Sequence, residues 1–209
     1  LRGSTGGLQE LDAQTLYLPY ATSLRMSDLG YQNKAQSGLK PCYNDLNTFL
    51  QRIYDAVTTP WPAYAEKGTH RDGQWIQLNT NILQIENEFY GTIRPKRVIF
   101  PGERPLHALR ERGVEYVEVR LMDLNPFEPV GINAQTLRFL DVFLLHCLQS
   151  DSPDDTPQEI AALAHNQHTT AERGREPGGT NVRTATQAEA MVRHMLAGLP
   201  DSVKTDQVR

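Results

Sequence analysis

Residues 78–97, LNTNILQIENEFYGTIRPKR, place two carboxylates, an amide and a tyrosine directly before a cationic turn. Read as an extended strand, this stretch alternates its side chains between two faces, so that Glu86, Glu88 and Tyr90 share one of them. The opposite face carries Leu83, Ile85, Asn87 and Phe89. Two carboxylates on one strand face repel each other, so solvent, a cation or arginine neighbours must offset them. Solvent is the simplest of the three, because most charged side chains lie on wet surface.

A second stretch, GVEYVEVRLMDLNPF at residues 113–127, has the same alternating character. As a strand it places Glu118 and Arg120 on one face together with Val114 and Tyr116. A carboxylate and a guanidinium in that position form either a structural ion pair or a functional pair. In the functional pair, the carboxylate holds a metal and the arginine meets a phosphate, as in phosphoryl transfer. The spacing alone leaves both interpretations open.

The loop LRMSDLGYQNK, residues 24–34, combines Arg25, Asp28 and Tyr31 with Gly30. An arginine and a tyrosine hydroxyl on one loop suit recognition of a small carboxylate ligand. A loop closed by its own surface hydrogen bonds is the alternative interpretation, and for this segment alone it is the simpler one.

Hydrophobic periodicity predicts most of the secondary structure. Helices are expected at residues 46–57 with Asn44 as the N-cap, at 134–148, at 157–173 and at 186–199. The helix at 134–148 is expected to bury one face formed by Leu137, Leu140, Phe143, Leu144 and Cys147. Extended segments are expected at residues 16–24, 74–90, 93–100 and 114–121.

Composition excludes several classes of protein. The net charge of −4 over 209 residues argues against nucleic acid as a partner, so Arg94, Lys96 and Arg97 are interpreted as a solvated turn rather than an RNA contact. No apolar run approaches the roughly 20 residues of a membrane span, and no secretory leader is evident. Two cysteines without CxxC spacing indicate a reducing cytoplasm. The chain starts with Leu1 in what looks like a loop, which suggests a piece of a longer protein.

Four segments taken together are more specific than any one of them. These are YLPYATSLRMSDLGYQNKAQS, LNTNILQIENEFYGTIRPKR, GVEYVEVRLMDLNPFEPVGI and QTLRFLDVFLLHCL. In this order and spacing they closely resemble the proteobacterial type of the glutamate–cysteine ligase family, from about Tyr17 to about Leu148. The similarity continues more loosely through RGREPGG to Gly179, and it is weak over the last thirty residues.

The resemblance implies a reaction. In this family ATP phosphorylates the side-chain carboxylate of glutamate, and the cysteine amine then displaces phosphate in the first step of glutathione biosynthesis. Mg²⁺ ions held by carboxylates gather the phosphate oxygens. Glu118 matches a metal ligand of the family and Arg120 an arginine facing the transferred phosphoryl group. Tyr31 and Tyr90 match the cysteine pocket, and Arg25 matches substrate-carboxylate recognition. Asn87 and Glu88 are expected to line or buttress the site. In that site the basic residues Arg94, Lys96 and Arg97 are expected to screen carboxylates or to contact anionic substrates.

The resemblance also implies an architecture. The expected fold is α+β, a largely antiparallel sheet with packed helices, similar to glutamine synthetase and guanidino kinases but incomplete. Residues 1–150 are expected to form part of the catalytic domain and residues 151–209 a polar helical segment. The substrates are glutamate, cysteine and ATP, and the full enzyme is expected to be monomeric, with no nucleic acid and no membrane as partner. The alternative is an inactive fragment that serves only as a folded binding module.

Overall fold

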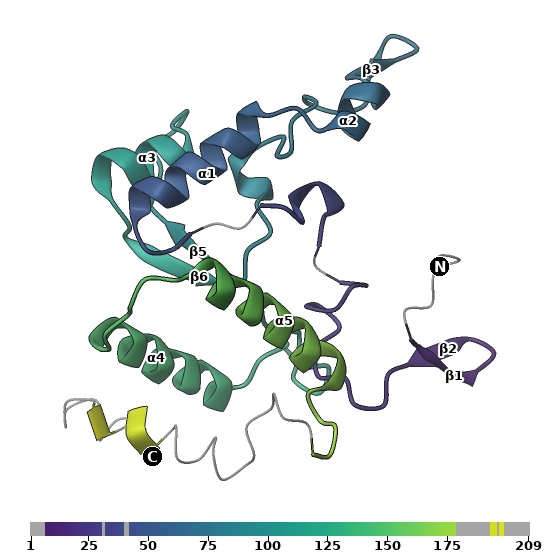
Figure 1. The fold of residues 1–209 in the computed structure, drawn as a ribbon, viewed down its shortest axis with the longest axis vertical. Coiled ribbons are helices and arrows are strands. Elements are labelled where there is room, and N and C mark those ends of the chain that lie inside the picture. Colours follow the sequence, from purple (N-terminus) through teal and green to yellow (C-terminus); the bar gives the residue numbers. More distant parts are fainter. Residues whose placement is uncertain (1–6, 31, 40–41, 179–192, 196, 199–209) are drawn as a thin grey trace. The chain divides into compact units, whose positions relative to one another are not determined.

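The computed structural model describes residues 7–30, 32–39, 42–178, 193–195 and 197–198 (Figure 1). The chain divides into two compact units. The first contains Ser23–Met122 and Asp155–His168, and the second contains Gly7–Thr22, Asp123–Asp154 and the described residues from Thr169 onward.

The elements are a mixture of helices and short strands. The helices are α1 (Leu46–Thr58), α2 (Pro62–Lys67), α3 (Pro105–Arg112), α4 (Ala134–Gln149) and α5 (Pro157–Arg173), with 3₁₀ turns η1 (Lys34–Gln36) and η2 (Glu86–Glu88). The strands form antiparallel pairs, namely β1 (Gln9–Asp12) with β2 (Thr15–Tyr17), β3 (His70–Arg71) with β4 (Gln74–Trp75), and β5 (Ile93–Lys96) with β6 (Tyr116–Val119). The expectation of a mixed fold with antiparallel strands is therefore confirmed, but the described strands form separate pairs rather than one large sheet.

Helix α1 supplies the centre of the core of the first unit. Its apolar side chains recur at helical spacing, so one face packs inward against α3, beside which it lies in Figure 1. The core cluster comprises Phe49, Leu50, Ile53, Ala56, Leu83, Phe89, Leu106 and Leu109. The N-cap is Asp45 and not the predicted Asn44, because the extended Asp45 aims its carboxylate at the Thr48 N–H at 2.9 Å.

The extended strand predicted for residues 74–90 is wrong beyond β4. Amide side chains in this segment bond to nearby backbone and so compete with a strand ladder. Asn79 accepts a hydrogen bond from the Asn81 N–H at 2.8 Å, and the side chain of Gln84 accepts one from the Leu78 N–H at 2.8 Å. The chain then closes the 3₁₀ turn η2, so Glu86, Glu88 and Tyr90 do not share a strand face.

The two carboxylates of η2 have separate structural partners. Glu86 accepts a hydrogen bond from the Leu106 N–H at 2.9 Å, at the first turn of α3, and lies 3.6 Å from an Arg104 nitrogen. A negative charge there is favourable because the first N–H groups of a helix have no partner within it. Glu88 accepts from the Gln84 N–H at 2.7 Å. Repulsion between the two is thus offset by local partners rather than by solvent alone.

Helix boundaries elsewhere follow the sequence closely. The structure confirms helices at 134–149 and at 157–173, the latter starting at Pro157 as predicted. Sequence periodicity missed the short helices α2 and α3, each of which has proline at its first turn. The helix predicted for residues 186–199 lies largely outside the described residues.

The second unit contains α4, whose predicted buried face is not buried in the described part of the chain. Leu137 is 49 % exposed and Phe143 is 37 % exposed, while Val142 is the residue of α4 that is buried. Phe139 and Phe143 stack on each other at 6.0 Å between ring centroids. The helical period was predicted correctly, but burial depends on what the rest of the fold places against the helix.

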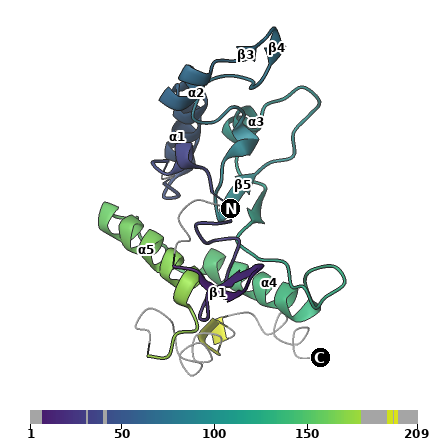
Figure 2. The same cartoon turned by 90° about the vertical axis from the view of Figure 1, so that its right-hand side faces the viewer.

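In both views the β3–β4 hairpin adjoins α2 and projects away from β5 (Figure 2).

Among the described residues, no helix combines the length and apolar character that crossing a bilayer requires.

Glu103 makes the stability of the first unit sensitive to acid. Two Arg112 nitrogens bond its carboxylate at 2.6 and 2.8 Å, and the Phe100 N–H adds a third bond at 2.9 Å. These bonds lower the pKa of Glu103 from 4.5 to about 2. A carboxyl whose pKa is lower in the folded state stabilises the fold fully above its unfolded pKa and loses that contribution as pH falls.

We therefore expect Glu103→Gln to destabilise the chain at neutral pH and to cost progressively less as pH falls from about 4.5 towards 2. Thermal unfolding followed by circular dichroism across this range measures the difference. Glu66→Gln on the exposed side of α2 is the matched control. A Glu103→Gln penalty that stays constant down to pH 2.5 contradicts the assignment.

Candidate active site

Strands β5 and β6 bring the two sequence stretches of interest together. They pair antiparallel, with Arg94 directly opposite Glu118 and Lys96 opposite Tyr116. The strands predicted at 93–100 and 114–121 are thus confirmed in shortened form. Because side chains alternate along each strand, Arg94 and Lys96 lie on the same face as Glu118 and Arg120.

Three cations surround the Glu118 carboxylate. Its Oε2 lies 4.0 Å from Arg94 Nε, 3.8 Å from Lys96 Nζ and 3.8 Å from Arg120 Nη1. We call these four residues the Glu118 cluster. With three positive charges and one negative charge, the cluster is cationic and suits an anionic ligand such as a polyphosphate.

Glu118 Oε2 is held by charge rather than by hydrogen bonds. The side chain is 38 % exposed, yet Oε2 is shielded from solvent and accepts no hydrogen bond. A shielded carboxylate oxygen without a hydrogen bond is costly unless something else uses it. The three cations offset that cost, so the exposed remainder of the side chain is the part that a ligand can reach.

Arg94 is the buried anchor of the cluster. It is 6 % exposed, and its guanidinium donates to the Asn87 carbonyl at 3.2 Å and to Asn87 Oδ1 at 3.3 Å. Both acceptors come from η2, so the turn fixes the direction of the guanidinium. Asn87 thus acts on the cluster through Arg94 in this structure.

Lys96 has an unusual environment for an ammonium group. Burial lowers its pKa, the positive charges of Arg94 and Arg120 lower it further, and Glu118 opposes the shift. An anion that binds here would relieve the repulsion among the three cations and would favour the charged form of Lys96.

The loop at residues 23–30 reaches the same strand pair. Arg25 Nε donates to the backbone carbonyl of Arg120, so a predicted substrate contact holds the backbone of a predicted catalytic residue. Gly30 closes the loop tightly: a Cβ there would lie 2.2 Å from the Leu24 carbonyl oxygen and 2.3 Å from that of Arg25. Only glycine fits this close approach.

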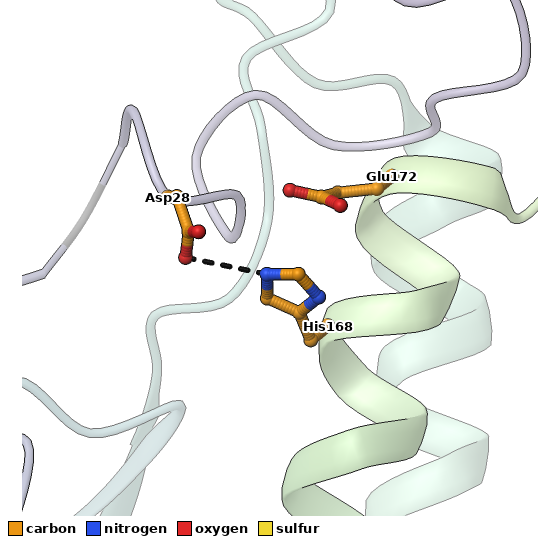
Figure 3. Close-up of side chains that lie close together, drawn as sticks. All are labelled: Asp28, His168 and Glu172. Carbon is orange, nitrogen blue, oxygen red and sulfur yellow. Dashed lines mark ion pairs between the residues drawn. The ribbon is translucent and has the colours of Figure 1, made fainter. Parts of the chain in front are cut away.

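Asp28 from the same loop forms an ion pair with α5. Its Oδ1 lies 3.3 Å from Nε2 of His168 (Figure 3). Figure 3 also labels Glu172, which follows His168 by one helical turn on α5. The Asp28–His168 contact links the loop to the helix.

Tyr90 lines a separate cavity in the first unit. The cavity has a volume of about 270 Å³ and includes Met26, Leu39 and Tyr43, with Leu163 from α5. The backbone of Tyr90 is held in place by a bond from its N–H to Gln36 Oε1 at 2.8 Å. A small, mainly apolar cavity with tyrosines suits a compact side chain such as a thiol.

The predicted site residues fall into three groups. Glu118, Arg120, Arg25 and Asn87 are connected through the Glu118 cluster, while Tyr90 lies in the cavity of about 270 Å³. Tyr31 lies outside the described residues. Sequence reasoning expected Arg94 and Lys96 to screen carboxylates or to contact anionic substrates, but it did not assign either of them an individual role. Their two-residue spacing within an extended segment was the signal that could have placed them on the face of Glu118.

The residues present supply only part of a metal site. Within the described part of the chain, no group of three histidine, cysteine or carboxylate ligands includes Glu118. Glu118 thus offers one ligand oxygen to Mg²⁺, and the neighbouring cations disfavour a bare metal ion. The donor set fits a metal that is already bound to phosphate oxygens.

Comparisons with known proteins agree with one another. The family model described as glutamate-cysteine ligase matches residues 1–170. A glutamate–cysteine ligase of Pseudomonas fluorescens is 60 % identical over 178 residues, which cover 85 % of this chain and 34 % of that protein. A glutamate–cysteine ligase of Bordetella parapertussis is 62 % identical over 179 residues, again covering 85 % of this chain and 34 % of the relative. The chain therefore spans about a third of the length of these relatives.

Solved structures give the same result. A glutamate–cysteine ligase of Francisella tularensis in complex with AMP is similar to 95 % of this chain, with a TM-score of 0.83 and 37 % identity, and the match covers 42 % of that protein. A bifunctional glutathione synthetase of Pasteurella multocida has a TM-score of 0.61 at 20 % identity, covering 95 % of this chain and 23 % of the other. The second similarity concerns the fold alone.

Proposed function

Because the chain belongs to the glutamate-cysteine ligase family, we propose that its site serves the ATP-dependent ligation of glutamate to cysteine, the first step of glutathione biosynthesis. In this reaction the γ-phosphoryl group of ATP passes to the side-chain carboxylate of glutamate and ADP leaves. The amine of cysteine then attacks the acyl phosphate carbon, loses a proton, and releases inorganic phosphate as the amide bond forms.

The observation that carries the proposal is the Glu118 cluster. Arg120 and Lys96 stabilise the negative charge on the phosphoryl oxygens, and Arg94 orients the Glu118 carboxylate. Glu118 would hold Mg²⁺ through the exposed part of its carboxylate, and the metal would neutralise charge on the ATP phosphates. The remaining metal ligands would come from outside the described residues.

Two further roles concern the amino-acid substrates. Arg25 recognises a substrate carboxylate, and its bond to the Arg120 carbonyl links that recognition to the phosphoryl-facing strand. Tyr90 forms the wall of the cysteine pocket, together with Tyr31 outside the described residues. Asn87 positions Arg94 and is not itself proposed to touch a substrate.

The proposal also covers the fold, the metal, the oligomeric state and the cellular location of the full-length protein. It includes an α+β fold of the glutamine synthetase and guanidino kinase type, with residues 1–150 in the catalytic domain and residues 151–209 as a helical segment. It also includes Mg²⁺ as the metal, a monomeric full-length enzyme and a cytoplasmic location. The antiparallel strand pair and its outer helices support the first of these.

A second function for the isolated chain is binding without turnover. It is favoured by the metal-ligand geometry, since Glu118 belongs to no group of three candidate ligands within the described residues. A chain that binds anionic substrates but assembles only one metal ligand would not accelerate phosphoryl transfer appreciably.

Phosphate release from ATP tests both functions. The assay contains Mg²⁺, glutamate and cysteine, with each amino acid omitted in turn, and compares this chain with a version extended to the length of the relatives. Release that requires both amino acids in the extended version supports the ligase. Release independent of cysteine contradicts it. Release by the isolated chain alone rules out the second function.

Replacing Tyr90 by phenylalanine in the extended version is expected to raise the KM for cysteine about 3- to 10-fold, because one substrate hydrogen bond of roughly 1 kcal/mol is lost. The KM for glutamate should change much less. Tyr54→Phe on the exposed side of α1 is the control, since that side chain is 48 % exposed and distant in sequence from the cavity. Equal increases in both KM values would exclude a role specific to cysteine.

A further inference from the structure

A second cavity lies between α1, α3 and strand β5 in the first unit. Its volume is about 330 Å³, which is within the range of small-molecule sites. The inner wall is apolar and comes from the core, with Phe49 and Ile53 on α1 and Leu109 on α3. These side chains are almost fully buried, so the wall is rigid and already formed.

The other side of this cavity is cationic. Arg94, Lys96 and Arg97, successive charged residues of the RPKR stretch, all line it. One acidic residue, Glu86, also contributes, but its carboxylate is already used by the Leu106 N–H and by Arg104. An apolar wall facing three cations fits a ligand with a compact apolar body and an anionic end.

Carboxylates already neutralise part of the positive charge at this cavity. Arg94 and Lys96 are 4.0 and 3.8 Å from Glu118, and Arg97 is 3.5 Å from Glu115. Two carboxylates thus neutralise part of the charge of the three cations, and one of them, Glu118, is shared with Arg120 at 3.8 Å. A carboxylate matches the positive charge that remains, and it can accept two parallel bonds from an arginine.

We propose that this cavity is a binding site for a small monocarboxylic acid with a compact apolar group, separate from the cavity lined by Tyr90. The apolar group packs on the wall formed by α1 and α3, and the carboxylate meets Lys96 and the neighbouring arginines. Arg94 and Lys96 also surround Glu118. A carboxylate bound in this cavity therefore pairs with these two cations and weakens their interaction with Glu118. The site is thereby placed to modulate whatever chemistry the cluster performs, but binding itself does not depend on the proposed ligase activity.

Ile99 offers a test that leaves the core intact. It lines the cavity yet is 43 % exposed, so a polar side chain is tolerated there. Ile99→Asp places a negative charge at the cavity and repels a carboxylate. Ile99→Lys also replaces the isoleucine by a charged residue, but its charge is positive and attracts a carboxylate. The comparison therefore isolates charge from any effect of losing the isoleucine.

The probe is 3-phenylpropionate, and its neutral counterpart 3-phenylpropanamide is the ligand control. Binding to the 209-residue chain is followed by two-dimensional amide NMR and by calorimetry. We expect the acid to bind at least about tenfold more tightly than the amide, with shifts at Ile53, Leu109 and β5. Ile99→Asp should weaken binding of the acid about fivefold or more, while Ile99→Lys should not weaken it.

Lys96→Met gives an independent result, because it removes a charge and keeps the aliphatic length. It should weaken binding of the acid and leave the affinity for the amide unchanged. Equal affinities for the acid and the amide would overturn the proposal. So would equal affinities of Ile99→Asp and Ile99→Lys for the acid, or binding of the acid that does not saturate up to about 10 mM. Because none of these readouts requires turnover, failure here and failure of the ligase assay are distinguishable.

Discussion

Replacing Glu118 by glutamine in a chain extended to the length of its relatives is expected to lower ligase turnover by about 10²-fold or more. The amide is nearly isosteric with the carboxylate but carries no charge. It would therefore no longer balance Arg94, Lys96 and Arg120, whose nitrogens lie 3.8–4.0 Å from Oε2. The Mg²⁺ concentration needed for half-maximal rate should rise as well, because a neutral oxygen is a weaker ligand for a hard cation.

Glu115→Gln is the matched control for that experiment. Glu115 lies three residues earlier, belongs to the other strand face and pairs with Arg97 at 3.5 Å. Its replacement removes a carboxylate from the same region without touching the Glu118 cluster. Steady-state phosphate release at varied Mg²⁺ measures both variants. Turnover of Glu118→Gln equal to that of the unmodified protein would remove Glu118 from the active site.

Leu83→Ala is expected to destabilise the first unit by about 2–5 kcal/mol. Leu83 is completely buried and belongs to the core cluster with α1 and α3. Its N–H also donates to the Ala56 carbonyl at 2.9 Å, so the backbone around it is fixed and collapses poorly onto a cavity. Substitution by alanine therefore removes apolar contacts and leaves most of the space empty.

Urea unfolding followed by circular dichroism measures this loss. Leu78→Ala is the control, because Leu78 lies five residues earlier in the same stretch and is 66 % exposed. We expect the control to change the free energy of unfolding by less than about 0.5 kcal/mol. A Leu83→Ala variant as stable as the control would mean that the segment at residues 78–89 is not part of the cooperative core.

The strand pair at the candidate site was largely predictable. Alternation predicted that Glu118 in β6 and Arg120 directly after β6 lie on one face, and the structure agrees, with 3.8 Å between Glu118 Oε2 and an Arg120 nitrogen. Strict periods of two residues, like those of 3.6 residues in α1, α4 and α5, are local properties of the chain. They survive in the structure because nothing in the surrounding sequence competes with them.

The segment at residues 78–90 was less predictable, and the reason is only partly local. Its alternating pattern matched a strand, but Asn79 and Gln84 bond to nearby backbone and turn the chain, and the Asn81 side chain donates to the distant Val57 carbonyl in α1 at 2.6 Å. The sequence pattern shows only whether each position is polar or apolar. Whether the backbone pairs with another strand or with nearby side chains depends on the three-dimensional path of the chain. Glu86 shows the consequence, since it contacts the first turn of a helix twenty residues later.

The sequence by itself determined the helical periods, the antiparallel strands, the family and the residue types available for chemistry. The tertiary structure decided which of those residues meet. It brought Arg94 and Lys96 to Glu118 by pairing strands more than twenty residues apart, and it set Asn87 behind Arg94. It also left α4 with an exposed apolar face in the described part of the chain. The physical reason is that periodicity arises from bonds between near neighbours, while charge neutralisation and burial depend on what the whole fold places nearby.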